Sequence, residues 1–105
     1  MLQVQVFFDQ DDRHEDRPLA DYLMRYLLRN GIRGATIFAA ASGFGEKRRI
    51  HEPRKIGHLD ESPLLLIFTD DETRVREVLP HLRQVVRGGL VLTLGVTEVP
   101  VDLSS

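Results

Sequence analysis

The sequence predicts an α+β domain in which a four-stranded antiparallel sheet carries both helices on one face. Two patterns support this prediction: short apolar stretches typical of strands, and two longer stretches with the period of about 3.6 residues typical of helices. Their order along the chain is strand, helix, strand, strand, helix, strand. With right-handed crossovers, this order places all strands in one sheet and both helices on one side of it. The 105 residues fit a single domain, 1–105.

The first strand and the first helix are predicted from their different periodicities. Alternating apolar residues at the start of the chain indicate a half-buried strand: Leu2, Val4, Val6 and Phe8. The polar stretch 9–17 is expected to be a loop, and Pro18 suits the first turn of a helix. The helix then carries one apolar stripe: Leu19, Tyr22, Leu23, Tyr26 and Leu27. Asn30-Gly31 is expected to end it, because these residues tolerate positive φ.

The second half of the chain repeats this alternation of strand and helix. A second strand is expected over about 33–42, and the apolar run 64–68 (LLLIF) predicts a central strand. Cap-type and acidic residues at 69–72 (TDDE) precede a second helix, which Pro80 should kink or interrupt. The apolar stripe of that helix is Val75, Val78, Leu79, Leu82 and Val86. A last strand is expected over 90–99, ended by Pro100, with a loose tail over 100–105.

The face of the sheet opposite the helices is expected to be bare. Phe8 and Thr93 are interpreted as outward residues on that face. An uncovered sheet face of this kind is expected to pack against something, most simply another copy of the chain.

Composition excludes several classes of protein. A net charge of −2 argues against a general polyanion binder, and the absence of cysteine excludes disulfides and thiolate metal sites. The stretch 1–6 (MLQVQV) alternates like a strand and lacks the features of a signal peptide. No apolar run approaches the roughly 18 residues that a membrane span requires. We therefore expect a cytoplasmic protein.

Metal and catalytic sites are only weakly indicated. The acidic stretch 9–16 offers oxygen ligands but lacks the EF-hand pattern, so a solvated turn is favoured. No pair of histidines has the i, i+4 spacing of a helical zinc site, and surface positions are favoured for all of them: His14, His51, His58 and His81. Ser42 lies in no nucleophile elbow. We expect no enzyme and no bound metal, with a metal-dependent enzyme using His51 and His58 as the least favoured alternative.

The most distinctive stretch combines glycines with basic residues. Gly43-Phe44-Gly45 follows the apolar run 35–41, and Lys47 and Arg48 come directly afterwards. Backbone N–H groups near the glycines, together with these cations, favour an anion-binding concavity. The segment from 43 to about 62 has no helical or strand period, so we interpret it as a long functional loop.

Two further interpretations concern the surroundings of this loop. Gly88-Gly89 predicts a second tight turn, which in this topology could lie near the same sheet end in a neighbouring subunit. Alternatively, the basic loop serves a nucleic-acid-binding module through Lys47, Arg48, Arg49 and Arg54. That alternative is less favoured, because Phe44 alone offers no aromatic platform and the overall charge is negative.

Residues 30–37 (NGIRGATI), followed by Gly43-Phe44-Gly45 and the basic loop, resemble the PII signal-transduction superfamily. The likeness is closest to a PII-like branch in which a proline-leucine pair, here Pro18-Leu19, starts the first helix. It extends from Val4 to Val99 in the same order of elements.

The resemblance implies a ferredoxin-like fold assembled as a homotrimer, which would cover the open sheet face. It implies a regulatory protein that binds an adenine nucleotide in clefts between subunits and engages a transporter or an enzyme through the 43–62 loop. The base of that loop and the facing turn supply the expected ligand-binding residues: Gly43, Phe44, Gly45, Lys47, Arg48, Gly88 and Gly89. The tyrosine modification of some PII proteins is not expected, because no tyrosine lies between Gly45 and Ser62.

Overall fold

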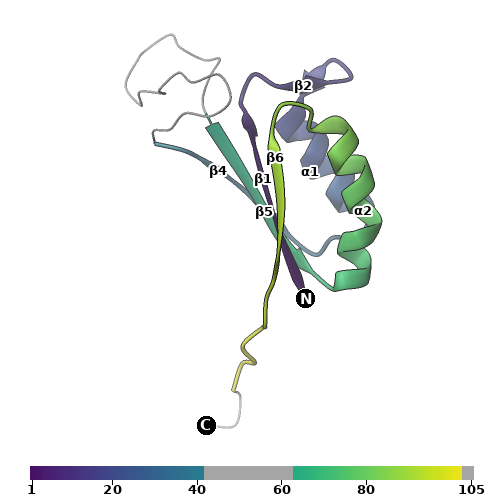
Figure 1. Ribbon diagram of the computed structural model, residues 1–105, viewed down its shortest axis with the longest axis vertical. Helices are drawn as coiled ribbons and strands as arrows, with labels where there is room; N and C mark the ends of the chain where they lie inside the picture. Colours follow the sequence, from purple (N-terminus) through teal and green to yellow (C-terminus); the bar gives the residue numbers. More distant parts are fainter. Residues whose placement is uncertain (42–62, 103–105) are drawn as a thin grey trace.

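The computed structural model describes residues 1–41 and 63–102, which form a four-stranded antiparallel sheet under two helices (Figure 1). The strand order in the sheet is β4-β5-β1-β6. The strands are β1 (Leu2–Asp9), β4 (Ala35–Ala39), β5 (Pro63–Asp70) and β6 (Leu90–Gly95). The predicted α+β fold class is therefore confirmed. No helix in the described parts of the chain is both long and apolar enough to span a membrane.

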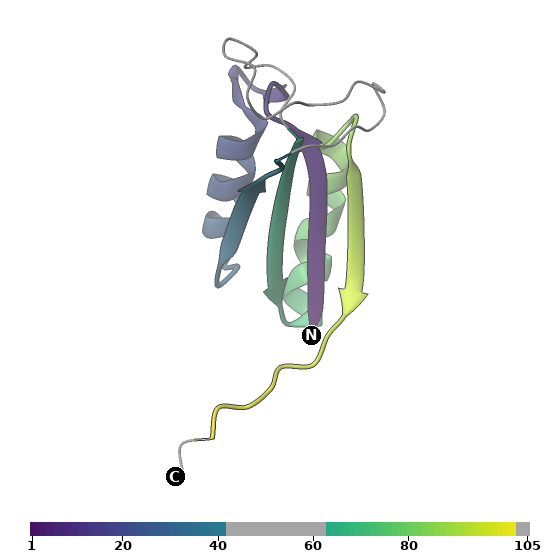
Figure 2. The same ribbon diagram turned by 90° about the vertical axis from the view of Figure 1, so that its left-hand side faces the viewer.

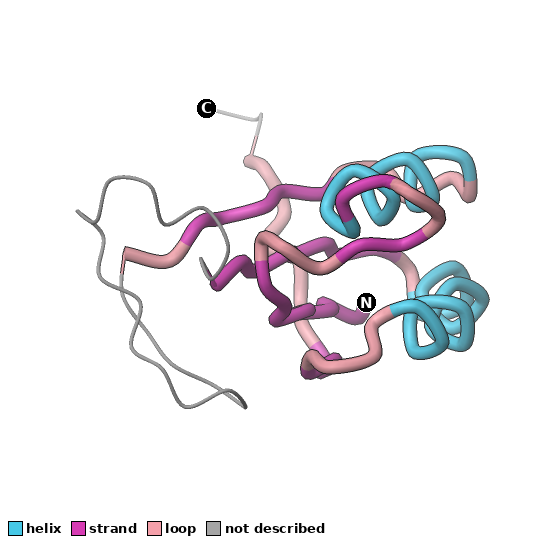
Figure 3. The backbone as a smooth tube through the Cα atoms, turned by 90° about the horizontal axis from the view of Figure 1, so that it is seen from above, coloured by secondary structure: helices cyan, strands magenta, loops and turns pink. Residues whose placement is uncertain are grey.

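Both helices lie on the same side of the sheet, as Figure 3 shows from above. They are α1 (Leu19–Arg29) and α2 (Glu72–Val85). Between them and the sheet lies a single apolar core, in which the two helical stripes meet alternate residues of β1 and β5. Its fully buried members include Val4, Val6, Leu23, Leu66, Val75 and Leu82.

The polar stretch after β1, predicted as a loop, contains a small hairpin. Its strands are β2 (Arg13–His14) and β3 (Arg17–Pro18). The turn residues Glu15 and Asp16 have φ values of 52° and 64°, the left-handed region that most residues avoid. No apolar alternation marks such short strands, and therefore the sequence pattern does not show them.

The ends of two strands and the course of α2 differ from the prediction. The ladder of β4 ends at Ala39 and that of β6 at Gly95, so both strands are shorter than their apolar runs. α1 ends as predicted, with Asn30 as its C-cap and Gly31 at φ 80°. α2 runs on through Pro80, so the predicted interruption is wrong. The exposed proline costs α2 one hydrogen bond, to the carbonyl of Arg76, while packed residues on both sides of it keep the helix in place.

The interpretation of Phe8 and Thr93 as residues of the open face is wrong. Phe8 is 5% exposed and belongs to the core, and Thr93 pairs with Val4 on the helix-facing side of the edge strand β6. Because strand residues alternate between faces, it is Phe7 that points to the open side. The open face, toward the viewer in Figure 2, carries these large exposed apolar residues: Phe7, Phe38, Leu90, Leu92 and Leu94.

Candidate functional site

The residues expected to bind a ligand divide into two groups. Those of the loop base lie outside the described residues: Gly43, Phe44, Gly45, Lys47 and Arg48. Gly88 and Gly89 are described, and they form the turn that joins α2 to β6. Only this second half of the predicted site can therefore be described in detail.

Gly89 is required by the close approach of two backbone segments. A Cβ atom at this position would lie 2.2 Å from the carbonyl oxygen of Phe7 and 2.8 Å from Cγ1 of Val86. Real Cβ atoms do not come this close to a backbone oxygen, so any side chain would push the turn away from β1. The turn predicted from Gly88-Gly89 lies between α2 and β6, and the close contact with β1 explains why residue 89 is a glycine.

The turn shares one end of the sheet with the borders of the 42–62 segment. The register pairs Leu90 with Phe7, Phe7 with Leu65, and Leu65 with Phe38, so β6 starts where β4 ends and β5 begins. Yet β4 and β6 form opposite edges of the sheet, with β5 and β1 between them. In one chain, the Gly88-Gly89 turn and the end of β4 are therefore at the same level but on different edges.

A hollow of about 280 Å³, the turn hollow, lies between the hairpin and the Gly88 turn. Its polar lining mixes charges: Asp12, Arg13, His14, Glu15 and Arg87. Arg13 is held in place, because its Nη2 donates to the carbonyl oxygen of Asp16 at 2.7 Å. The hollow therefore brings two arginines beside a glycine turn, and the carboxylates of Asp12 and Glu15 in the same lining balance their charge.

A second hollow, of about 620 Å³, lies at the other end of the sheet, and we call it the β4–β5 hollow. It is lined by the start of β4, the end of β5 and one residue that follows β6: Arg33, Gly34, Ala35, Thr36, Ile67, Phe68, Thr69 and Glu98. The 30–37 stretch that carries the family resemblance thus opens onto a hollow, which sequence reasoning did not predict.

Asp70 fixes the backbone and the arginine beside this hollow. Its carboxylate is fully buried and accepts hydrogen bonds from the backbone N–H groups of Arg33 at 2.9 Å and Asp71 at 2.8 Å. Arg74 Nη1 donates to it at 3.1 Å, and Arg33 Nε lies 3.4 Å away. Burial alone would raise the pKa of Asp70, but these backbone hydrogen bonds and arginine charges outweigh it and lower the pKa.

The role of Asp70 was missed, because the sequence pattern marked it only as a residue before the second helix. The N-cap of α2 is Asp71, whose side chain makes no capping hydrogen bond. In the sequence Asp70 only follows the apolar run 64–68 and Thr69, and the alternating burial of β5 is seen in the structure alone. At that register position its side chain has to point into the core, where an unpaired charge is not tolerated.

His14 and His81 belong to an aromatic cluster between the hairpin and the two helices. Tyr22 Oη lies 2.6 Å from Nε2 of His81, and the ring of His14 meets that of Tyr22 edge-on at 4.3 Å. The ring of Tyr26 lies 4.5 Å from His81, and burial, with a smaller effect of Tyr22, raises the pKa of Tyr26. Both histidines thus join elements together, whereas His51 and His58 lie outside the described residues.

One acidic group with metal-ligand spacing occurs among the described residues. Carboxylate oxygens of Asp9, Asp11 and Asp12 lie within 4.8 Å of one another. The Asp12 carboxylate also accepts the backbone N–H of Asp9 at 3.0 Å, which is a turn-forming contact.

Comparison with known families gives one match over nearly the whole chain. The model of the DUF190 family, described as "Uncharacterized ACR", matches residues 1–98. A "UPF0166 protein" of Aquifex aeolicus is 25% identical over 91% of this chain and 90% of its own length. Another "UPF0166 protein", from Methanocaldococcus jannaschii, is 27% identical over 85% of this chain and 82% of its own.

Solved structures with the same fold include two groups of proteins. CPII of Thiomonas intermedia K12, a nitrogen regulatory PII-like protein bound to ADP, AMP and bicarbonate, superposes with a TM-score of 0.61 at 18% identity. The match covers 89% of this chain and 82% of CPII. CutA1 of Pyrococcus horikoshii superposes with a TM-score of 0.64 at 15% identity, over 97% of this chain and 89% of its own. At these identities the likeness establishes the fold.

Proposed function

This chain belongs to the DUF190 family and has a PII-like fold, and from these facts we propose that it is a non-enzymatic regulatory protein that binds an adenine nucleotide. The observation that carries the proposal is the combination of this fold, the fold of CPII bound to ADP and AMP, with a glycine turn whose surroundings include Arg13 and Arg87. The proposed place of action is the cytoplasm.

The proposed binding site lies between copies of the chain in a homotrimer. This is supported by the position of the Gly88-Gly89 turn, which lies at the same level as the end of β4 but on the opposite edge of the sheet. A neighbouring copy brings the two edges together. The open sheet face supports an assembly as well, because monomeric proteins rarely expose a continuous apolar patch of this kind.

Within this site, the two glycine motifs act on the phosphates of the ligand. Backbone N–H groups of Gly43-Phe44-Gly45 and of Gly88-Gly89 face the phosphates, while Lys47 and Arg48 supply positive charge. Ligand binding then orders the 43–62 loop and changes its fit to a regulated partner, a membrane transporter or an enzyme.

Calorimetric titration with AMP, ADP, ATP and cyclic nucleotides tests this proposal. We expect at least one of them to bind with one site per copy, and a Lys47→Gln/Arg48→Gln variant to bind it about tenfold or more weakly, as loss of charge-assisted contacts predicts. Arg83→Gln, which changes an exposed arginine in the last turn of α2, is the matched control and should bind normally. An oligomeric, folded protein that binds none of these nucleotides would refute the proposal.

A salt series separates this function from nucleic-acid binding through the same loop. Affinity for a single-stranded oligonucleotide is expected to be weak and to fall steeply with salt concentration. Binding of an oligonucleotide more tightly than of any mononucleotide would favour the nucleic-acid alternative.

A further inference from the structure

The turn hollow has walls of opposite charge. Among the described residues that line it, the hairpin side contributes Asp12 and Glu15 against a single arginine, Arg13, and the turn side contributes Arg87. With His14 counted as neutral, the hairpin side is therefore net negative and the turn side net positive. Figure 1 shows the hairpin, labelled at β2, and the turn between α2 and β6 at the same end of the molecule. A ligand that spans the hollow thus meets carboxylates on one side and a cation on the other.

The lining also has an apolar part, and the hollow is small. Leu19 at the start of α1 and Val85 at the end of α2 line it, and core packing holds both in place. The volume of about 280 Å³ lies just below the roughly 300–1,000 Å³ of pockets that hold drug-sized ligands. The hollow therefore suits a molecule smaller than a nucleotide, with an apolar part of its own.

The charged groups on both sides can make further hydrogen bonds. Arg13 uses Nη2 to donate to the carbonyl oxygen of Asp16 at 2.7 Å, and a guanidinium has five N–H donors in all. The carboxylate of Glu15 lies 3.7 Å from Nε2 of His14, and a carboxylate offers about four acceptor sites. These local contacts orient the hairpin side chains and leave bonding capacity for a ligand.

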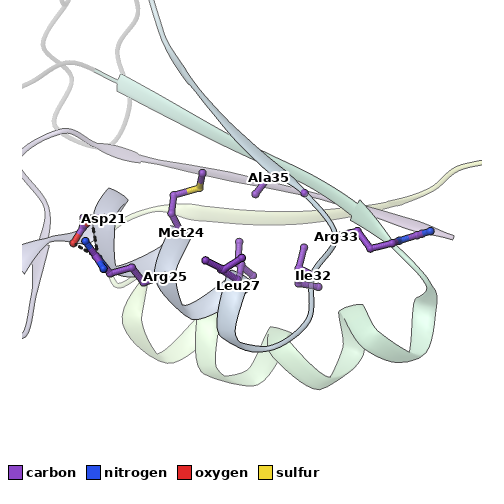
Figure 4. A pocket seen from close by; sticks show the side chains of 9 residues that line it. Asp21, Met24, Arg25, Leu27, Ile32, Arg33 and Ala35 are labelled. Atoms are coloured by element: carbon purple, nitrogen blue, oxygen red, sulfur yellow. Dashed lines mark hydrogen bonds and ion pairs between the residues drawn. The ribbon is translucent and has the colours of Figure 1, made fainter.

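The groove between α1 and β4, shown in Figure 4, is a useful contrast. It is larger, at about 420 Å³, and its middle is apolar, with Met24 pointing toward β4. Its arginines are bonded to acids of the same chain: Arg25 Nε donates to both carboxylate oxygens of Asp21, at 3.0 and 3.1 Å. Arg33 Nε lies 3.4 Å from the buried carboxylate of Asp70. This groove therefore lacks the two opposed charged walls of the turn hollow.

We propose that the turn hollow binds a free α-amino acid with an apolar side chain. The carboxylate of the ligand accepts hydrogen bonds from Arg87, and its ammonium group donates to the carboxylates of Asp12 and Glu15. Its side chain lies against Leu19 and Val85. The proposal goes beyond the nucleotide function, because it adds a second ligand. The nucleotide is expected to meet backbone N–H groups of the glycine turn, whereas the amino acid uses the charged side chains.

A zwitterion suits this hollow better than a simple ion of either sign. A monocarboxylate can bond to Arg87, but it brings a negative charge toward Asp12 and Glu15. An amine has the opposite defect, since it faces Arg87 with a positive charge. Like charges brought together across a binding site weaken binding, so each wall excludes the ion that the other one attracts.

Titration of the isotope-labelled full chain with L-leucine, followed by the chemical shifts of its amides, tests the proposal. Isocaproate, which lacks the ammonium group of leucine, and isoamylamine, which lacks its carboxylate, are the matched probes. We expect leucine to shift the amide signals of His14 and Gly88 saturably. Either analogue should bind at least tenfold more weakly, because one set of charge-assisted hydrogen bonds is lost.

Three variants locate the binding in the turn hollow. Arg87→Gln and Glu15→Gln change exposed side chains on opposite walls, and each should weaken leucine binding about tenfold or more. Arg25→Gln is the matched control, since it changes an exposed arginine of the other groove, and it should bind leucine normally.

Three results would overturn the proposal. The first is no saturable shift with leucine, valine or alanine. The second is binding of isocaproate as tight as that of leucine, which would mean a simple anion site. The third is an equal loss of affinity in Arg87→Gln and Arg25→Gln. No nucleotide is present in these titrations, so failure here is distinguishable from failure of the proposed function.

Discussion

The two faces of one sheet differ in how completely the chain itself covers them. On the helix side, Val4, Val6 and Leu66 are fully buried, and even the charge of Asp70 is matched by hydrogen bonds. On the other side, Phe7 and Leu92 remain more than a third exposed. Because both faces belong to the same strands, folding of the single chain explains only one of them. The apolar residues of the open face are therefore not explained by packing within one chain.

Neighbouring leucines in β5 provide the largest expected effect. Leu66 is fully buried on the helix side, and Leu65 lies on the open side. Leu66→Ala should reduce the free energy of unfolding by about 3–5 kcal/mol, because it leaves a cavity in a packed core. Urea denaturation measures this loss. In a dissociated chain, the matched variant Leu65→Ala should reduce the free energy of unfolding clearly less than Leu66→Ala does. Equal reductions would mean that the two faces of the sheet are equally well packed.

Asp70 gives the next largest effect and makes the helix side sensitive to pH. Asp70→Asn should reduce the free energy of unfolding by about 2–3 kcal/mol. The neutral amide has only one acceptor oxygen, whereas the buried carboxylate now accepts hydrogen bonds from Arg33, Asp71 and Arg74. The folded-state pKa of Asp70 is lowered, so its stabilisation is complete above its unfolded pKa of about 3.9 and is lost as pH falls through the folded value.

Denaturation of both proteins across pH 2–7 checks this second prediction. The difference in free energy of unfolding between the natural chain and Asp70→Asn should be constant near neutrality and should shrink below about pH 4. Asp71→Asn is the control, since Asp71 is exposed and its side chain makes no capping hydrogen bond. A difference that persists undiminished at low pH would show that the carboxylate charge is not what stabilises the fold.

The sequence predicted the helix side of the molecule well, for a physical reason. The stripes of α1 and α2 and the alternation in β1 record burial within the chain, and burial leaves a periodic pattern. The alternation in β1 already grouped Phe8 with Val4 and Val6, and the structure buries all three on the helix side. The interpretation of Phe8 as an outward residue went against that pattern, and it was wrong.

The candidate site was less predictable, because its features depend on contacts between distant parts of the chain. Gly89 stood out by residue type, but its cause, the carbonyl oxygen of Phe7, lies 82 positions earlier in the chain. The hairpin at Glu15–Asp16 and the bonds of Asp70 to Arg33 leave no periodic signal either. Residue types were thus enough to predict the turn. The hollows could be found only in the folded structure, because residues far apart in the sequence line them.

Leu92 provides the smallest effect on a single chain and the sharpest test of the open face. Leu92→Gln should change the free energy of unfolding of a dissociated chain by no more than about 0.5 kcal/mol, because the side chain of Leu92 is only partly buried in the single chain. It should nevertheless weaken self-association by about tenfold or more, since an apolar contact between copies is replaced by a polar group. Sedimentation velocity over a range of concentrations measures that shift.

The matched control for Leu92 lies one residue further along the same strand. Thr93 is exposed on the helix-facing side of β6, so Thr93→Gln should leave self-association unchanged. If both variants dissociate equally, the effect comes from the edge strand as a whole and not from its open face. If neither dissociates, the apolar residues of the open face do not hold copies together, and the contrast between the two faces requires a different partner.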